Sequence, residues 1–159
     1  MSKTLFRLLL ITVLCAGFIG GLWITAPRYS EAQAGTWTAY VYNTRNLDAP
    51  IGGGPPIWTG ISSTVNYTWG AGPPVINGLT TGAPADEFSV RFITTAFFTA
   101  GRYRFTAQYD DGARLYIDGM LLVNDWNTGS FRQQQADYTF TADGNHTITV
   151  EMFDATGDA

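Results

Sequence analysis

The chain has 159 residues, 9 of them basic and 13 acidic, for a net charge of −4, and this length allows one domain. An acidic domain repels phosphate backbones, which argues against a nucleic-acid partner and leaves cations and neutral ligands such as sugars. Cys15 is the only cysteine, so no internal disulfide forms and stability must come from a packed core or from bound metal.

The first 34 residues have the pattern of a secretory signal peptide. Lys3 and Arg7 form a positive start, residues 8–26 are apolar, and a small-x-small motif ends at Ala34. We predict cleavage after Ala34. The alternative is an uncleaved membrane anchor, because the apolar run is nearly long enough to span a bilayer. Cleavage removes three basic residues and one acidic residue, which leaves 6 basic and 12 acidic, or −6. A secreted or cell-surface location follows, with membrane contact only through residues 1–34.

The remaining residues, 35–159, predict an all-β domain. No helical periodicity of useful length occurs, and Thr, Val, Ile and aromatic residues alternate between clusters of Gly and Pro. Residues 43–56 predict a Gly/Pro-rich crossing, and residues 70–86 predict a long loop without regular structure. Strands are expected at Trp37–Tyr42, 62–69, 88–92, 103–109, 131–140 and 146–153.

Two short motifs predict tight turns. Asp118-Gly119 separates two β-rich runs, and both residues tolerate the positive φ of a two-residue hairpin. Asp143-Gly144-Asn145 has the same character between the last two strands. The sequence therefore predicts a hairpin around residue 118 and a second sharp turn near residue 144.

Two adjacent acids, Asp110 and Asp111, stand before Gly112 at the start of the hairpin's first strand. Hard cations such as Ca²⁺ take several oxygen ligands at roughly 2.3–2.6 Å, often from carboxylates. Neighbouring side chains of an extended chain point to opposite sides, whereas a cis peptide between them would turn both to one side. The pair therefore indicates either a cation site or an ordinary polar turn whose Asp side chains bond nearby backbone N–H groups.

Enzyme chemistry finds little support in the sequence. His146 is the only histidine, no Gly-x-Ser-x-Gly nucleophile motif exists, and residues 35–159 hold no cysteine. A glycosidase needs two carboxyl groups about 5 Å or more apart, so the adjacent Asp110 and Asp111 suit one cation better than a glycosidic bond. We predict a domain that is not an enzyme.

The stretch "YRFTAQYDDGARLYIDGMLLVNDW" resembles the core of the PA-fourteen domain family. "WTAYVYNTRNL", "VNYTWG" and "HTITVEMFDATGDA" resemble other segments of that family, so the similarity covers nearly all of residues 35–159. The family is a β-sandwich module of anthrax-toxin protective antigen, flocculin-type adhesins and many bacterial glycosidases and surface proteins. The resemblance implies an antiparallel, jelly-roll-like β-sandwich.

The resemblance also implies a ligand site. In lectin members the adjacent Asp pair is joined by a cis peptide and binds Ca²⁺, which coordinates sugar hydroxyls; Asp110 and Asp111 match that pair. An Asn after the late strand supplies a further ligand there, but this chain has Ala155 at that position, with Asp154 as the substitute. The implied metal ligands are Asp110, Asp111 and Asp154. The implied contacts to a glycan or cell-surface polysaccharide are Asp154 and Trp126, although Trp126 is also expected to cap the sandwich.

A second function fits the same family. The domain at 35–159 would be a structural or protein-interaction module of a larger surface protein, because Ala155 replaces the expected Asn. The family also continues with one more apolar strand beyond the "GDA" position. We therefore expect residues 35–159 to lack that last strand and to leave an open sheet edge.

Overall fold

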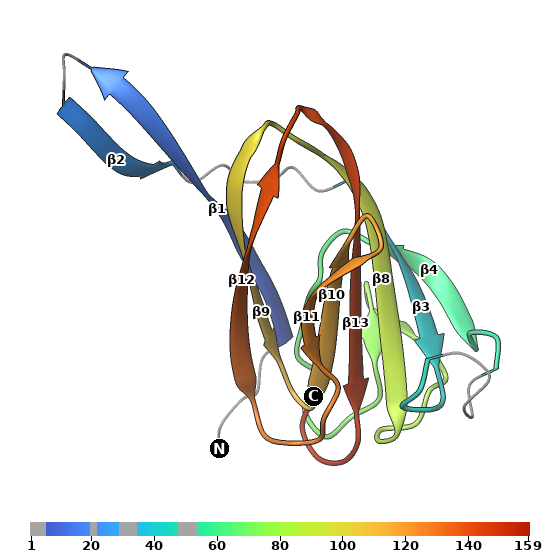
Figure 1. The fold of residues 1–159 in the computed structure, drawn as a ribbon. Coiled ribbons are helices and arrows are strands. Elements are labelled where there is room, and N and C mark those ends of the chain that lie inside the picture. The colour runs from blue at the N-terminus through green and yellow to red at the C-terminus, as the bar shows by residue number, and fades with distance from the viewer. Residues whose placement is uncertain (1–5, 20–21, 29–34, 48–53) are drawn as a thin grey trace.

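The computed structural model describes residues 6–19, 22–28, 35–47 and 54–159 (Figure 1). Every regular element among them is a β-strand, and all strand pairs are antiparallel. Within these ranges no helix is long and apolar enough to cross a membrane.

Sheet A contains five strands. Its order is β12 (Arg132–Phe140), β9 (Gly101–Tyr109), β1 (Phe6–Ile19) and β2 (Leu22–Arg28), and the short β5 (Asn66–Tyr67) also pairs with β1. The β9–β12 pairing is continuous from Tyr109↔Arg132 to Gly101↔Phe140.

Sheet B contains six strands and faces β9 and β12 (Figure 1). Its order is β11 (Met120–Asp125), β10 (Gly112–Ile117), β13 (Gly144–Asp154), β8 (Phe88–Phe98), β3 (Trp37–Tyr42) and β4 (Trp58–Ser62). The two sheets form the antiparallel β-sandwich that the sequence predicts.

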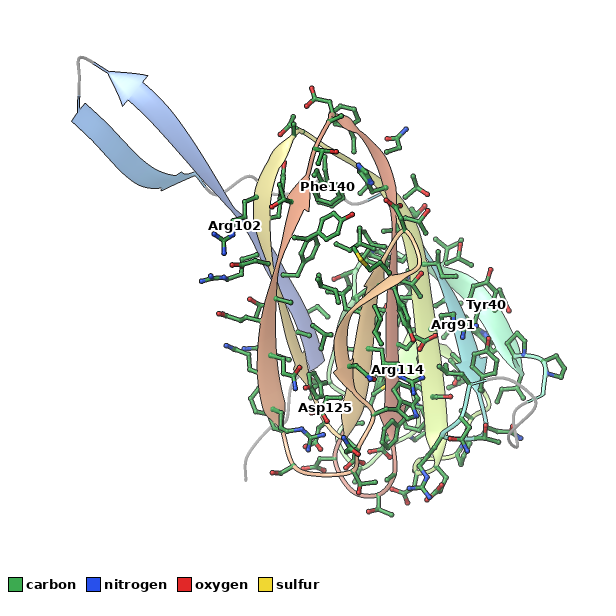
Figure 2. The ribbon with its side chains drawn as sticks, in the orientation of Figure 1. Tyr40, Arg91, Arg102, Arg114, Asp125 and Phe140 are labelled. Atoms are coloured by element: carbon green, nitrogen blue, oxygen red, sulfur yellow. The ribbon has the colours of Figure 1, made fainter. Side chains whose placement is uncertain are left out.

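Alternation along the strands builds the core between the sheets. Successive side chains of a strand point to opposite faces, so every second residue is buried. On β9 these are Tyr103, Phe105, Ala107 and Tyr109. At one end of the core the Phe98 ring stacks on Phe140 with 4.4 Å between centroids (Figure 2). Other buried core residues include Val41, Phe88, Val90, Phe92, Leu115, Ile117, Ile148, Val150 and Met152.

The N-terminal segment pairs with sheet A in this uncleaved chain. Strand β1 lies between β9 and β2, and its far end with β2 projects beyond the sandwich (Figure 1). An apolar extended segment satisfies the free N–H and C=O groups of a sheet edge, here that of β9. That residues 35–159 lack a last strand stays a prediction. Cleavage after Ala34 stays a prediction, and the cleavage motif itself lies outside the described residues.

Two sequence expectations for the middle of the chain are corrected. The strand expected at 62–69 is replaced by the two-residue β5 and the last residue of β4, and most of β4 at Trp58–Ser62 was not expected. The loop expected at 70–86 contains a small hairpin of β6 (Val75–Ile76) and β7 (Leu79–Thr80). Its turn residues, Asn77 and Gly78, both have positive φ, which suits a two-residue hairpin, but the flanking strands are too short to show a pattern. Of the predicted crossing at 43–56, residues 48–53 lie outside the described ranges.

The two predicted turns have different outcomes. Asp118 and Gly119 have φ of 50° and 80° and join β10 to β11, so this hairpin is confirmed. The second is also a short turn, at residues 141–143, but the strands it joins do not pair with each other: β12 pairs with β9, whereas β13 pairs with β8 and β10. It is a crossing from sheet A to sheet B, which local turn chemistry does not distinguish from a hairpin.

Candidate functional site

The acid pair occupies a crossing between the two sheets. Tyr109 ends β9 in sheet A, Gly112 begins β10 in sheet B, and only Asp110 and Asp111 lie between them. The Asp110–Asp111 peptide bond is cis, as the family resemblance implies. A Cβ on Gly112 would lie 2.2 Å from the Phe153 ring, so only glycine fits after the pair.

Asp111 connects three segments that are distant in the sequence. Its side chain is buried, with 6% of the residue exposed. One carboxylate oxygen accepts the backbone N–H of Gly129 at 2.7 Å, and the other accepts that of Ala155 at 2.7 Å. The Asp111 backbone N–H also donates to Phe153 at 3.2 Å. Each carboxylate oxygen has a second lone pair, so these bonds leave acceptor capacity for a cation.

Asp154, the last residue of β13, is the least satisfied acid of the site. It is 0% exposed, and within the described part of the chain neither carboxylate oxygen has a hydrogen-bond partner. Burial, followed by the charge of Asp111, raises the pKa of Asp154 to about 7. A buried carboxylate without partners costs folding free energy unless it is protonated or meets a cation.

Asp110 is half-buried beside these two acids. Burial and the negative charge of Asp111 raise its pKa to about 6, while a hydrogen bond from the Phe131 backbone and the charge of Arg132 act against that rise. Arg132 is the positive charge that already acts on Asp110. A cation bound between Asp110 and Asp154 would add a second and would be stabilised by both carboxylates.

Further acids surround Asp154. The charges of Asp86 and Glu87, just before β8, contribute to its raised pKa. Asp86 accepts the backbone N–H of Gly157 at 2.9 Å, which ties the segment before β8 to the residues after β13. Asp158 adds negative charge near Asp110. The site is therefore acidic well beyond the adjacent pair.

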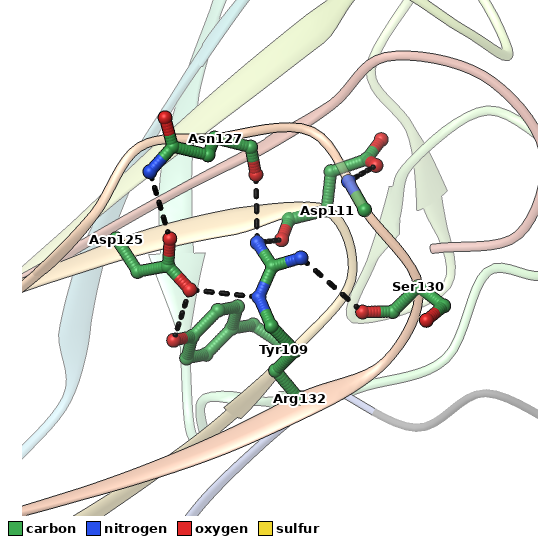
Figure 3. A network of polar contacts seen from close by, with 7 residues as sticks. Tyr109, Asp111, Asp125, Asn127, Ser130 and Arg132 are labelled. Atoms are coloured by element: carbon green, nitrogen blue, oxygen red, sulfur yellow. Dashed lines mark hydrogen bonds and ion pairs between the residues drawn. The ribbon is translucent and has the colours of Figure 1, made fainter.

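Beside the acid pair, a polar network is centred on Arg132, which the sequence analysis did not single out (Figure 3). The Asp125 carboxylate accepts Tyr109 Oη at 2.8 Å, Arg132 Nε at 2.7 Å and Asn127 Nδ2 at 3.1 Å. Arg132 Nη2 donates to the backbone carbonyls of Asp111 at 2.6 Å and Asn127 at 2.7 Å. The guanidinium thus joins β11, β12 and the acid pair.

Trp126 lies next to the network but packs against the protein. Its ring centroid is 4.8 Å from that of Phe153, and the Arg114 guanidinium lies over the ring at 4.2 Å. This agrees with the capping role expected from the sequence. Contact of Trp126 with a sugar stays a prediction.

Two other polar clusters have their partners within the protein. On the outer face of sheet B, Glu151 pairs with Arg91 at 2.8 Å and accepts Tyr116 Oη at 3.2 Å (Figure 2). His146 Nδ1 lies 2.6 Å from Asp118 Oδ2, beside the hairpin turn. These contacts, the ion pair of Glu151 and the hydrogen bond between His146 and Asp118, hold neighbouring strands together.

The acid site can be tested for its fit to a cation. Its donors are carboxylate oxygens, which suit Ca²⁺, and Asp154 offers two oxygens that nothing else in the described chain engages. Across the described residues, no three Asp, Glu, His or Cys side chains form a ready-made metal cage. The carboxylate donors therefore suit calcium chemically. The other oxygens that coordinate the ion would come from the backbone, from water or from a bound sugar.

The family model for the PA14 domain matches residues 76–159, which include the acid pair, the Arg132 network and Asp154. The chain belongs to the PA14 domain family. This is the PA-fourteen resemblance of the sequence analysis, and the PA14-type β-sandwich agrees with it. No curated protein matches the chain.

Solved structures share this PA14 fold. An anti-sigma factor domain-containing protein superposes with a TM-score of 0.62 at 22% identity, over 77% of this chain and 40% of its own. The PA14 domain of the MpAFP antifreeze protein superposes with a TM-score of 0.54 at 16% identity, over 82% of each chain. A β-glucosidase from Kluyveromyces marxianus gives 0.50 at 14% identity, over 77% of this chain and 16% of the enzyme. This chain thus spans less than half of the first protein's length.

Proposed function

We propose that this chain is a secreted or cell-surface carbohydrate-binding module without catalytic activity, and that it binds sugars through Ca²⁺. Asp110, Asp111 and Asp154 are the proposed calcium ligands. The observation that carries the proposal is Asp154, a fully buried carboxylate with two unpartnered oxygens beside an adjacent acid pair. Location outside the cell follows from the leader predicted at residues 1–34.

Each acid has its own part in the proposed site. Asp111 is held by the Gly129 and Ala155 amides and gives the site a fixed point. Asp110 and Asp154, whose pKa values are raised by burial and by neighbouring charge, supply the carboxylates that gain most from a cation. Bound calcium would supply coordination positions for sugar hydroxyls.

Charge supports a neutral ligand. Asp86, Glu87 and Asp158 add negative charge around the proposed ligands, so an anionic sugar would meet repulsion even with one dication bound. Neutral polysaccharides carry the hydroxyl pairs that calcium coordinates and avoid this repulsion. A PA14-type fold in a β-glucosidase, a sugar-cleaving enzyme, supports a carbohydrate partner as well.

Ala155 supports a second candidate, a structural or protein-interaction module. This residue stands where the family's lectins carry an Asn ligand, and its methyl group offers no oxygen. Its backbone N–H is already bonded to Asp111. In such a module the acids would serve only to join the loops.

Binding to a panel of neutral glycans, measured in calcium and then in EGTA, tests the proposal. We expect binding in calcium that EGTA abolishes and that Asp154→Asn removes. Asp137→Asn is the matched control, because Asp137 pairs with Arg102 and Arg104 on sheet A and belongs to no part of the site. A panel without binding in calcium would overturn the carbohydrate proposal and favour the interaction module.

A further inference from the structure

We propose that Arg132 is a positioning residue of the cation site, holding the acid pair and the 126–131 loop in the geometry that binds calcium. The inference rests on the proposed function above. Arg132 would not touch the ion; it would act through the backbone of Asp111 and through the loop that caps that residue.

The first support is the geometry of the guanidinium. Arg132 Nη2 donates to the carbonyl of Asp111 at 2.6 Å and to that of Asn127 at 2.7 Å, which spans the acid pair and the 126–131 loop (Figure 3). Because a guanidinium is planar with fixed donor directions, two such bonds restrict both carbonyls together.

The second support is that the guanidinium is itself fixed. Asp125 accepts Arg132 Nε at 2.7 Å and also accepts the hydroxyl of Tyr109, whose side chain is fully buried in the core. The Arg132 guanidinium also lies 5.5 Å from the centroid of the Tyr109 ring. The core therefore determines where the guanidinium lies, and the guanidinium adds to the Gly129 and Ala155 amides in holding Asp111.

The third support is Gly129, whose backbone lies directly against Arg132. A Cβ on Gly129 would lie 2.0 Å from Arg132 Nη1, so any larger residue at this position would have to displace the guanidinium. At the same residue the backbone N–H donates to the Asp111 carboxylate at 2.7 Å. Gly129 thus contacts both the Arg132 guanidinium and the Asp111 carboxylate.

The direction in which calcium affinity changes when Arg132 is removed distinguishes a positioning role from a purely electrostatic one. Arg132 is a cation whose charge acts on Asp110, so its removal should strengthen calcium binding if charge alone mattered. Positioning predicts the opposite, because freed carboxylates lose the arrangement that the ion needs. Residues that orient metal ligands typically contribute about 10- to 100-fold to metal affinity.

Calcium titration by calorimetry of the whole chain tests the inference. We expect Arg132→Met to weaken calcium affinity by roughly 10- to 100-fold. Gly129→Ala, which displaces the guanidinium and leaves every charge in place, should weaken it in the same direction. Arg104→Met is the matched control, because Arg104 pairs with Asp137 across β9 and β12, away from the acid pair. We expect the calcium affinity of this variant to match that of the wild type.

A measurement without calcium gives an independent readout. Amide hydrogen exchange of Gly129 should be faster in Arg132→Met than in the wild type, because the loop is no longer held. If that variant does not fold, Arg132→Lys keeps the charge but loses the planar fork, and it should weaken calcium binding as well. Equal or tighter binding in the folded Arg132 and Gly129 variants overturns the inference. A wild type that binds no calcium would instead refute the proposed function.

Discussion

Replacing Asp154 by asparagine should stabilise the calcium-free protein at neutral and alkaline pH. Asparagine has nearly the shape of the protonated acid but cannot ionise. Asp154 is fully buried without hydrogen-bond partners in the described chain, so its ionised form has nothing nearby to stabilise it. In calcium chelator, the wild type should therefore carry a penalty that the variant lacks.

The raised pKa sets the size and the pH range of this penalty. The pKa of Asp154 rises from 3.8 to about 7 in the folded protein, and each unit corresponds to about 1.4 kcal/mol. The folded state therefore retains its proton to higher pH than the unfolded chain. The stabilisation of the folded state by the proton on Asp154 is fully present below pH 3.8 and is lost as the pH rises to about 7. This loss amounts to at most ~4 kcal/mol of the free energy of unfolding. Unpaired amide hydrogens in the variant cost about 1–3 kcal/mol, independent of pH.

Urea denaturation in chelator from pH 5 to pH 8 measures this difference. The free energy of unfolding of Asp154→Asn minus that of the wild type should rise by a few kcal/mol between pH 5 and about pH 7 and then level off. Asp137→Asn is the control with a flat profile, because Arg104 and Arg102 lower the pKa of Asp137 to about 2, so Asp137 is ionised in both the folded and unfolded states across this range. A difference for Asp154→Asn that stays constant with pH would refute the reasoning.

Three further outcomes follow from the structure. Calcium affinity should fall as pH drops from 8 to 6, because Asp154 and Asp110, with pKa values raised to about 7 and 6, then bind protons in competition; titrations at equal affinity would contradict this. Phe98→Ala should cost about 3–5 kcal/mol in urea denaturation, because it removes a core ring stacked on Phe140, and a cost under about 1 kcal/mol would contradict it. Mass spectrometry of the exported protein should show Gly35 as its first residue, and a retained leader would contradict cleavage.

The strands and one hairpin could be predicted because their signals are local. Alternating apolar residues predict β9, and Asp118-Gly119, two residues whose φ values are positive, predicts the turn between β10 and β11. The crossing near residue 144 could not be predicted, because its turn chemistry resembles a hairpin while its two strands belong to different sheets. Which sheet a strand joins depends on partners that are distant in the sequence.

The candidate site likewise has features that the local sequence predicts and features that depend on distant segments. The acid pair is visible in the sequence because Asp110 and Asp111 are adjacent, and the family resemblance implies their cis linkage, which the structure bears out. Arg132 was missed because its hydrogen-bond partners come from separate segments, namely the acid pair after β9, the end of β11 and the loop after β11. The burial of Asp154 likewise depends on the packing of segments that its neighbours in sequence do not reveal.

Calcium titration by calorimetry of the wild-type chain tests the central claim most directly. We predict that one ion binds per chain, with heat that disappears in Asp110→Asn and in Asp154→Asn. We also predict that calcium at about a hundredfold excess over Kd stabilises the fold by roughly 2.7 kcal/mol, seen as a higher Tm. No binding heat in the wild type, with equal Tm in calcium and in chelator, would contradict the account and leave Asp110 and Asp111 as an ordinary turn between two sheets.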